Sequence, residues 1–340
     1  MKYPSITELV LRDGQQSLIA TRMRLSDITP ILSKLDNVGF SSLEMWGGAT
    51  YDCCLRFLNE DPWERLKVIK SNIKNTQLQM LLRGKNLVGY KKYDETVIDL
   101  FINKSSENGI DIFRIFDALN DINNIVYSIE CANKYNANSQ GTISYTTSPV
   151  HNEKYWLKLA KDIEDAGAKS LGIKDMAGLL KPKTAYNLIK KLKRNLNIPI
   201  HLHTHATTGL SDATNFKAYE AGVDNIDTSI SSFSNLYAHT ATESLISMIY
   251  DGKDNPFNMN ELAEISDYFQ NIRNKYSQYE GSMKGVDIKM LINQVPGGML
   301  SILEKQLLDL NKLDKLDDLV TEIPRIRKDI GYIPVSYTHL

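Results

Sequence analysis

The sequence predicts an α/β fold, a (β/α)8 TIM barrel of parallel strands, followed by a C-terminal all-helical annex. Short β-rich segments alternate strictly with helix-like segments, and such alternation implies parallel strands joined by right-handed crossovers. We count eight of these pairs, the number that closes a barrel. After Gly252 the strand pattern stops, so we expect the barrel over residues 1–252 and the annex over residues 253–340.

The elements follow in order along the chain. The expected strands are short apolar and β-branched runs, at Ile6–Asp13, Ser42–Gly47, Leu78–Gly84, Asp111–Asp117, Gly141–Ser148, Ser170–Asp175, Ile200–Ala206 and Asn225–Ile230. The expected barrel helices are Ser26–Val38, Pro62–Asn72, Asp94–Glu107, Ile122–Tyr135, Glu153–Ala166, Pro182–Asn195, Ser211–Ala221 and Thr240–Tyr250. Several begin with a proline in the first turn, and several end at a glycine that can adopt the left-handed conformation. The expected annex helices are Asn260–Gln278, Gly297–Leu310 and Asp314–Lys328.

Composition narrows the class of protein. The formal net charge is −1, and a chain with so little net charge is not expected to bind nucleic acid or an anionic membrane surface by electrostatic attraction. The first residues lack the apolar core of a signal peptide, and no apolar run approaches membrane-spanning length. The three cysteines, Cys53, Cys54 and Cys131, have no metal-ligand or redox spacing. We expect reduced thiols and a cytoplasmic setting.

Two histidines separated by one residue, His203 and His205, are the most informative pair in the chain. Side chains two apart on a strand point the same way, so both, and His201 with them, face one side. Buried imidazoles need hydrogen-bond or metal partners. Two at the carboxyl end of a strand can reach one divalent ion, although a surface strand of solvated histidines remains the alternative.

Charged residues also end the other expected strands: Arg12 and Asp13, Arg83, Arg114 and Asp117, and Lys174 and Asp175. In a barrel of this type, catalytic groups cluster at the carboxyl ends of the strands. Asp13 with two histidines makes a ligand set for zinc, manganese or cobalt, and guanidinium groups suit a carboxylate substrate. Each residue also has a structural alternative. Arg114 and Asp117 could form an ion pair, Lys174 could pair with a carboxylate, and Asp13 could cap a loop.

These residues lie in motifs that resemble a known family. The motifs are Leu11-Arg-Asp-Gly-Gln-Gln-Ser17, Gly47-Gly-Ala-Thr-Tyr-Asp52, Arg56-Phe-Leu58 with Glu60-Asp-Pro-Trp63, Leu82-Arg-Gly84, Gly89-Tyr90, Arg114-Ile-Phe-Asp117, Ile173-Lys-Asp-Met-Ala-Gly178 and His203-Thr-His205. In this order they resemble the carboxyltransferase domain of biotin-dependent carboxylases: pyruvate carboxylase, in its fused and separate-subunit forms, the transcarboxylase core subunit and the oxaloacetate decarboxylase α subunit. The resemblance runs from Thr7 to Tyr332 and includes Pro296-Gly-Gly-Met299.

The resemblance implies roles for individual residues. Asp13, His203 and His205 match the family's metal ligands, and Lys174 matches a lysine whose carbamate binds the same divalent metal. Residues that match the pocket for pyruvate or oxaloacetate and the biotin ring are Gln16, Asp52, Arg83 and Tyr90, with Arg12 and Arg114 close to it. Of these, Lys174, Arg83 and Gln16 are the expected catalytic residues. Burial of Lys174 would favour its neutral, reactive amine.

The implied activity is transfer of a carboxyl group, as oxaloacetate decarboxylation or pyruvate carboxylation, with the direction left open. No Ala-Met-Lys-Met run of a biotin carrier domain occurs, so we expect biotin on a separate carrier protein or on a missing C-terminal part. Other implied partners are a second copy of the chain and either a biotin carboxylase or membrane decarboxylase subunits. Membrane decarboxylase subunits as partners would place the chain at the periphery of a membrane complex. Thr338 lies near the family's proton-moving threonine but lacks its surrounding pattern.

Two other interpretations stay open. The chain could be an inactive or scaffolding subunit of such a complex, given its abrupt last residues. It could also be an acyl-CoA lyase or synthase of the same barrel superfamily, which shares Arg-Asp-Gly and His-x-His. These relatives lack the blocks at Gly47–Asp52 and Arg114–Asp117.

Overall fold

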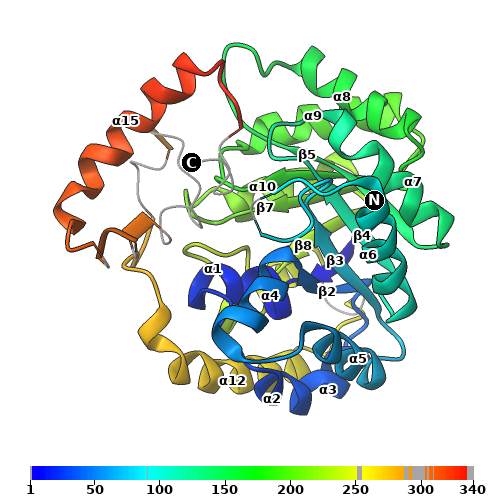
Figure 1. Ribbon diagram of the computed structural model, residues 1–340, viewed down its shortest axis with the longest axis vertical. Helices are drawn as coiled ribbons and strands as arrows, with labels where there is room; N and C mark the ends of the chain where they lie inside the picture. The colour runs from blue at the N-terminus through cyan, green and yellow to red at the C-terminus, as the bar shows by residue number, and fades with distance from the viewer. Residues whose placement is uncertain are drawn as a thin grey trace.

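Eight parallel strands form a closed barrel in the order of the chain, as predicted (Figure 1). The strands are β1 (Ser5–Glu8), β2 (Ser42–Gly47), β3 (Gln77–Leu82), β4 (Ile112–Phe116), β5 (Asn138–Ser144), β6 (Ser170–Asp175), β7 (Ile200–Thr204) and β8 (Asn225–Thr228). β8 pairs with β1 from Ser5 opposite Asn225 to Glu8 opposite Thr228, which closes the barrel. This computed structural model describes residues 2–89, 91–250, 255–286 and 310–334, together with 291, 292, 303, 304 and 306–308.

Helices surround the barrel. The longer ones are α5 (Pro62–Asn72), α6 (Glu95–Glu107), α7 (Val126–Lys134), α8 (Glu153–Asp165), α9 (Pro182–Asn195), α10 (Ser211–Ala221) and α11 (Thr242–Ile249). Their starts follow from local chemistry. The Asp61 side chain accepts from the Trp63 backbone N–H at 2.8 Å, and Pro62 occupies the first turn of α5. Gly222, at φ 87°, ends α10 in the left-handed conformation.

The region expected as one helix over Ser26–Val38 is three short pieces, α2 (Leu25–Ile28), a 3₁₀ turn (Thr29–Ile31) and α3 (Leu32–Asn37). Pro30 lies in the 3₁₀ turn. It has no backbone N–H to donate, and its ring clashes with the preceding turn of an α-helix. The proline therefore tightens the middle of this segment.

The expected first strand, Ile6–Asp13, is too long. β1 ends at Glu8, and Val10–Gly14 forms a π-helix, η1, followed by α1 (Gln15–Ile19). A second unpredicted pair follows β2, namely α4 (Gly48–Cys53) and the π-helix η3 (Cys54–Leu58). Single π turns are rare and concentrate at functional sites. Both lie at the carboxyl end of the barrel.

Where the structure describes it, the annex consists of helices and the segments that connect them. It contains α12 (Met259–Lys275), short 3₁₀ turns at Ser277–Tyr279 and Leu313–Lys315, and α15 (Leu316–Asp329). α12 lies beside α2 and α3 in Figure 1, where the Tyr268 hydroxyl donates to the Asp27 carbonyl at 2.8 Å. α15 is tied to the barrel by Arg327, which donates to Thr146 Oγ1 at 2.9 Å. The proposed boundary at 252 and 253 and Pro296–Met299 lie outside the described residues, as does most of the expected helix Gly297–Leu310.

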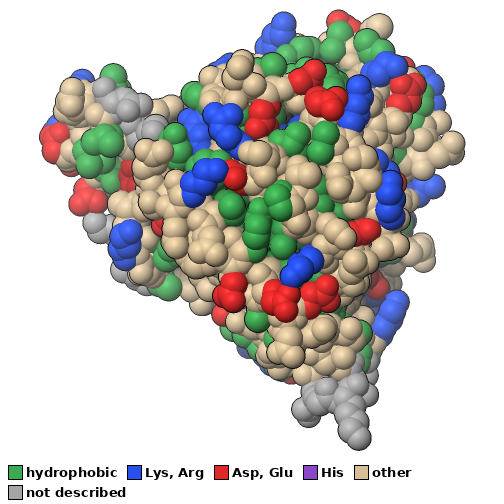
Figure 2. Space-filling view, turned by 90° about the horizontal axis from the view of Figure 1, so that it is seen from below, with side chains coloured by type: hydrophobic (Ala, Val, Ile, Leu, Met, Phe, Trp, Pro, Cys, Tyr) green, Lys and Arg blue, Asp and Glu red, His purple; other side chains and the backbone are tan. Residues whose placement is uncertain are grey.

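The surface is that of a mixed-charge protein. On the face in Figure 2, basic and acidic side chains are interspersed, and apolar side chains form small groups between them. Within the described ranges, no helix is long and apolar enough to cross a membrane. Cys53, Cys54 and Cys131 are free thiols, as expected.

Candidate metal centre and active site

Asp13 lies on the π-helix η1, directly after the first barrel strand. This placement needs a glycine at position 14, because a Cβ there would come 2.5 Å from Ser229 Oγ and 3.2 Å from the Phe233 carbonyl oxygen. The wide π turn brings the Asp13 carboxylate over the end of the barrel. Its Oδ1 accepts a hydrogen bond from Ser17 Oγ at 3.0 Å, while Oδ2 faces a group of cationic and imidazole side chains.

The Asp13 carboxylate is ionised in these surroundings. Burial alone would raise its pKa, but the nearby charges of Arg12 and Lys174 outweigh burial and hold the pKa well below its usual range. Arg12 approaches Asp13 Oδ2 at 2.8 Å and also donates through Nε to Glu44 Oε1 at 2.6 Å. The ionised carboxylate is the form that can bind a divalent cation.

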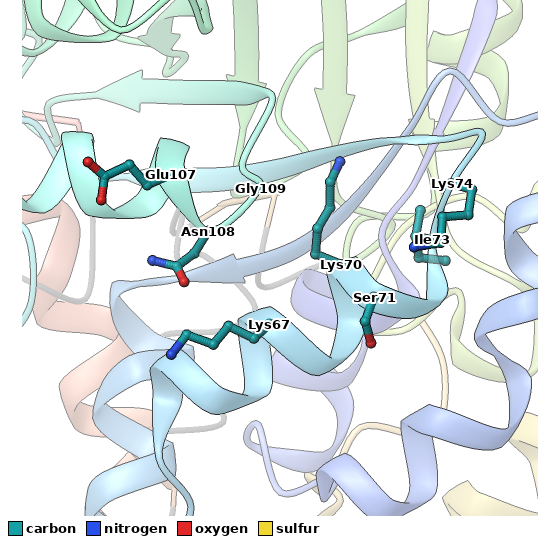
Figure 3. A pocket seen from close by; sticks show the side chains of 8 residues that line it. All are labelled: Lys67, Lys70, Ser71, Ile73, Lys74, Glu107, Asn108 and Gly109. Carbon is teal, nitrogen blue, oxygen red and sulfur yellow. The ribbon is translucent and has the colours of Figure 1, made fainter.

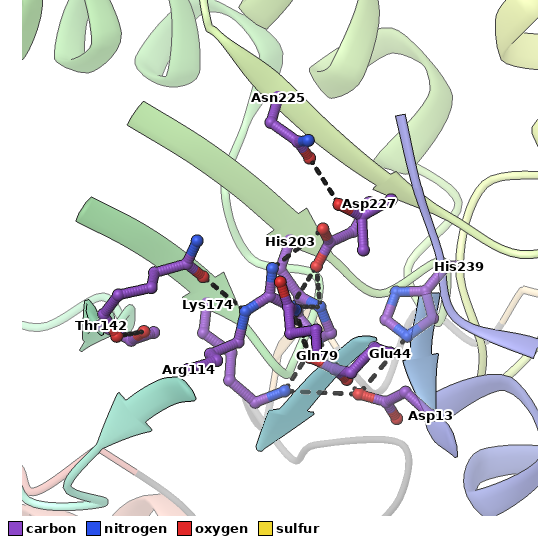
Figure 4. A network of polar contacts seen from close by, with 12 residues as sticks. Asp13, Glu44, Gln79, Arg114, Thr142, Lys174, His203, Asn225, Asp227 and His239 are labelled. Atoms are coloured by element: carbon purple, nitrogen blue, oxygen red, sulfur yellow. Dashed lines mark hydrogen bonds and ion pairs between the residues drawn. The ribbon is translucent and has the colours of Figure 1, made fainter. Parts of the chain in front are cut away.

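Three imidazoles face this carboxylate oxygen. The Nε2 atoms of His203, His205 and His239 lie 3.3, 3.8 and 3.6 Å from Asp13 Oδ2. All three rings are buried, and the ligand atoms of the four residues lie within 4.8 Å of one another. Figure 4 shows Asp13, His203 and His239 converging on the same point. His203 and His205, which we expected to face one side of their strand, both lie in this cluster, whereas His201, on the same strand, lies outside it.

The other ring nitrogen of each histidine is held by the protein. His203 Nδ1 lies 2.7 Å from Asp227 Oδ2, His205 Nδ1 lies 2.7 Å from the Tyr237 carbonyl oxygen, and His239 Nδ1 lies 3.0 Å from the Thr204 carbonyl oxygen. These acceptors place the proton on Nδ1 and leave the Nε2 lone pair for a ligand. Metal-binding histidines are held in this manner.

Burial also keeps two of these imidazoles neutral. Desolvation, reinforced by nearby Lys174, lowers the pKa of His203 to about 4. Desolvation likewise holds the pKa of His205 well below its ordinary value. Neutral imidazole is the form that binds metals.

Lys174, at the end of β6, enters the same cluster. Its Nζ lies 2.8 Å from His203 Nε2 and 3.4 Å from Asp13 Oδ2. Desolvation is the largest influence on its pKa and lowers it to about 8, as expected from the sequence. An amine that loses its proton near neutral pH is reactive toward electrophiles such as CO2.

Arg114 does not pair with Asp117, the alternative that the sequence left open. It lies in the barrel interior, bound to Asp227 through Nη2 at 3.0 Å and to Glu44 Oε2 through Nη1 at 3.0 Å. Its Nε donates to Gln140 Oε1 at 2.6 Å. A buried guanidinium needs several acceptors, and these three residues provide them. Burial alone would raise the pKa of Asp227, but its ion pair with Arg114 holds that pKa well below the usual range.

Asp117 and Asp175, at the ends of their strands, bind the backbone of the loops that follow. Asp117 accepts from the backbone N–H groups of Leu119 and Asp121 at 2.8 and 3.0 Å. Asp175 accepts from Leu179 and Leu180 in the same way at 2.9 and 2.8 Å. Both therefore shape the rim of the site rather than its centre.

The residues expected to bind the substrate lie at the same end of the barrel. Arg83, after β3, lies 3.9 Å from Asp52 Oδ2, and Asp52 accepts from the Gly89 backbone N–H at 3.0 Å. Arg83 is partly accessible and pairs loosely, so its guanidinium can engage another carboxylate. Gln16 lies on α1, half-buried, next to the π-helix that carries Asp13. Tyr90, also expected here, lies outside the described residues.

Four residues of the centre were not predicted from the sequence: Ser17, Glu44, Asp227 and His239. A signal existed for Asp227, an acid within the apolar strand Asn225–Ile230. His239 belongs to no motif, but it follows the last barrel strand and hence lies at the active end. Its place beside His205 depends on an antiparallel bridge between the two residues.

A separate open pocket of about 450 Å³ lies at the opposite end of the barrel (Figure 3). Its lining comes from the segments that precede β3 and β4, and the residues are Lys67, Lys70, Ser71, Ile73, Lys74, Glu107, Asn108 and Gly109. Lys70 is 3.3 Å from Asp111 Oδ2. The pocket lacks the buried ionisable groups of the centre, and catalytic chemistry in these barrels belongs to the other end.

Comparison with known proteins agrees with this geometry. Residues 4–269 match the HMGL-like family, and residues 290–336 match the conserved carboxylase domain. A pyruvate carboxylase subunit of Methanocaldococcus jannaschii is 50% identical, over 97% of this chain and 59% of that protein. The methylmalonyl-CoA carboxyltransferase 5S subunit of Propionibacterium freudenreichii subsp. shermanii is 47% identical, over 97% of this chain and 66% of that protein.

The solved structures give the same result. The carboxyl transferase domain of Rhizobium etli pyruvate carboxylase with pyruvate has a TM-score of 0.96 and 36% identity, covering 99% of this chain and 59% of that chain. The chain thus spans about three-fifths of the length of the relatives it matches. It belongs to the HMGL-like family and is homologous to the carboxyltransferase subunits and domains of these carboxylases.

Proposed function

We propose that this chain is a metal-dependent carboxyltransferase, which moves a carboxyl group between oxaloacetate or pyruvate and biotin on a carrier protein. The observation that carries the proposal is the buried cluster of Asp13, three histidines and Lys174 at the carboxyl end of the barrel. The homology to carboxyltransferase subunits supports the reaction class.

The donor set suits a divalent ion such as zinc, cobalt or manganese. Asp13, His203 and His205 would bind it, because the two imidazole Nε2 atoms lie 3.3 and 3.8 Å from Asp13 Oδ2 and all of these donor atoms lie within 4.8 Å of one another. When bound, such an ion stabilises the negative charge that develops on the keto oxygen of the substrate.

Lys174 is proposed to act as a carbamate. Its neutral amine attacks CO2, an N–C bond forms, and one proton leaves, so the ammonium is replaced by an anionic oxygen ligand. The charges of the centre support this exchange. Arg12, Arg114 and Lys174 balance Asp13, Glu44 and Asp227 in the buried network. Conversion of the ammonium (+1) to a carbamate (−1) lowers the net charge of this network by two, and a divalent ion restores it.

The remaining residues divide between substrate and scaffold. We propose that Arg83 binds the substrate carboxylate in two hydrogen bonds, with Gln16, Asp52 and Tyr90 lining the pocket for the keto acid and the biotin ring. Arg12 and Arg114 are saturated by buried acids. Their proposed contribution is therefore to hold Asp13 and His203 in place beside the substrate.

The reaction exchanges a carboxyl group for a proton. The bond between oxaloacetate and its transferred carboxyl group breaks, the carboxyl group joins a biotin nitrogen, and the proton of that nitrogen goes to the carbon left behind. The products are pyruvate and carboxybiotin, and the reverse exchange makes oxaloacetate. Biotin is proposed to arrive on a carrier polypeptide, with biotin carboxylase or membrane decarboxylase subunits as further partners.

Metal removal tests this proposal. Pyruvate formation from oxaloacetate, measured with added biotin, should depend on a stoichiometric divalent metal, be lost on chelation and return when the metal is added back. Lys174→Ala should abolish turnover, while Lys161→Ala on the exposed surface of α8 should not change it. A chain that binds metal but never forms pyruvate would favour the scaffolding role, and cleavage of an acyl-CoA instead would favour the lyase interpretation.

A further inference from the structure

His239 has the features of a metal-binding residue, not of one that only packs beside the metal ligands. Its side chain is completely buried, and its Nδ1 is engaged by the Thr204 carbonyl oxygen at 3.0 Å. Its Nε2 has no hydrogen-bond partner among the residues that the structure describes. A buried polar atom left in this state destabilises the fold unless something binds it.

The unpaired nitrogen is aimed at the same oxygen as the two predicted histidine ligands. His239 Nε2 lies 3.6 Å from Asp13 Oδ2, between the values of 3.3 Å for His203 and 3.8 Å for His205. The ring centroid of His239 lies 4.5 Å from that of His203 and 4.2 Å from that of His205. The three imidazoles therefore surround one point opposite the carboxylate.

The backbone fixes His239 in this position. His205 and His239 form an antiparallel bridge, and the Ala206 N–H donates to the Ala238 carbonyl oxygen at 2.8 Å. A tight turn at Asn235 and Leu236, with φ of 58° and 52°, returns the chain toward β7. The segment after β8 thus packs against the end of β7. This packing places the imidazole of His239 in the cluster, although the residue does not belong to β7.

We infer that His239 is a fourth protein ligand, so that the ion is held by one carboxylate and three imidazoles. This inference rests on the proposed metal site. Three nitrogen donors favour a borderline ion such as Zn²⁺ or Co²⁺ over the oxygen-preferring Mg²⁺ and Ca²⁺. Four protein donors bind the ion without the Lys174 carbamate, which then adds a fifth ligand and is not required for metal retention.

X-ray absorption of the Co²⁺-loaded full chain tests the inference directly, because it counts imidazoles without requiring turnover. The wild-type chain should show three imidazoles per cobalt and His239→Gln should show two. Two imidazoles in the wild type would overturn the inference even if His239→Gln failed to fold. Far-UV circular dichroism of the metal-free proteins checks that the variant folds.

Affinity provides the second measurement. In competition with a chelator, His239→Gln should weaken Co²⁺ binding about a hundredfold, and Lys174→Ala should retain cobalt with all three imidazoles. His151→Gln is the matched control, since this imidazole packs on Trp156 outside the cluster and should leave affinity unchanged. Unaltered Co²⁺ affinity in His239→Gln would contradict the inference. Three imidazoles in a chain without carboxyl transfer would instead contradict the proposed reaction alone.

Discussion

At the scale of single residues, the centre depends on side chains that support the predicted ligands from behind. Asp227 is the clearest case, because it joins the interior ion network to the imidazole of His203. His203 presents Nε2 to the cluster only while its Nδ1 proton is held by the Asp227 carboxylate. The barrel interior and the reactive end are thus coupled through one ring.

Asp227→Asn tests this coupling. The amide removes the charge that accepts from His203 at 2.7 Å and that balances Arg114. We expect metal affinity to fall about ten- to hundredfold and the free energy of unfolding to fall by about 3–5 kcal/mol. Chelator competition and denaturant unfolding measure the two effects. Asp162→Asn, at an exposed pair with Lys158, should alter neither, and an unchanged affinity in Asp227→Asn would remove it from the site.

Arg83 is the residue that we expect to bind the substrate carboxylate. Arg83→Lys keeps the charge but loses the two parallel hydrogen bonds, so the KM for oxaloacetate should rise about tenfold or more. Steady-state kinetics of the biotin-dependent reaction measure this change, with Arg325→Lys on the exposed face of α15 as the control. Equal KM values for Arg83→Lys and the wild type would exclude Arg83 from the pocket.

Glu8 connects β1 to the segment after β8 and gives a pH-dependent stability. Its carboxyl group accepts from the Val10 and Ile230 N–H groups and from Thr242 Oγ1, at 3.0, 2.9 and 2.6 Å. Burial raises its pKa from 4.5 to about 8. The folded chain therefore binds more protons at this group than the unfolded chain between these values, and stability falls as the pH rises.

Glu8→Gln mimics the protonated carboxyl group and removes this dependence. The variant should gain stability relative to the wild type as the pH rises from 5 to 8, by about 3–4 kcal/mol at the upper end. Urea unfolding at the two pH values measures the difference. A constant difference between the two proteins across this range would show that Glu8 is ionised in the folded state.

At the scale of elements, sequence patterns located the regular segments and missed the irregular ones. The bounds of β2, β6, α5, α9 and α10 agree with the prediction, because apolar periodicity, proline starts and glycine ends act locally. The π-helix η1 has no such pattern. Its apolar residues continue those of β1, so the run reads as a longer strand, although Asp13 depends on the π turn for its position.

Gly14→Ala tests the π turn. The added Cβ would meet Ser229 Oγ at 2.5 Å and the Phe233 carbonyl oxygen at 3.2 Å, so η1 must move and carry Asp13 with it. We expect a loss of about 1–3 kcal/mol of stability and weaker metal binding. Thermal unfolding and chelator competition detect these changes. Gly285→Ala, where a Cβ meets nothing within 4 Å, is the control, and the two variants behaving alike would contradict the account.

At the scale of the whole molecule, the barrel and part of its centre could be predicted from the sequence. The eight alternating strand and helix segments predict the barrel. The spacing of His203 and His205 predicts that both side chains face the same point. His239 could not be placed, because its contact with His205 is made by a loop that returns across the barrel end. The partners of Arg114 were equally hidden, since Glu44 and Asp227 come from distant strands.

Transfer of a labelled carboxyl group is the most direct test of the central claim. Oxaloacetate carrying isotope in its transferable carboxyl group is incubated with the metal-loaded chain and a biotinylated carrier protein, and the label on the carrier is counted. We expect label on biotin together with an equal amount of pyruvate, both lost on chelation and in Lys174→Ala. Pyruvate formation with no label on biotin under any condition, or undiminished transfer by the metal-free chain, would contradict that claim.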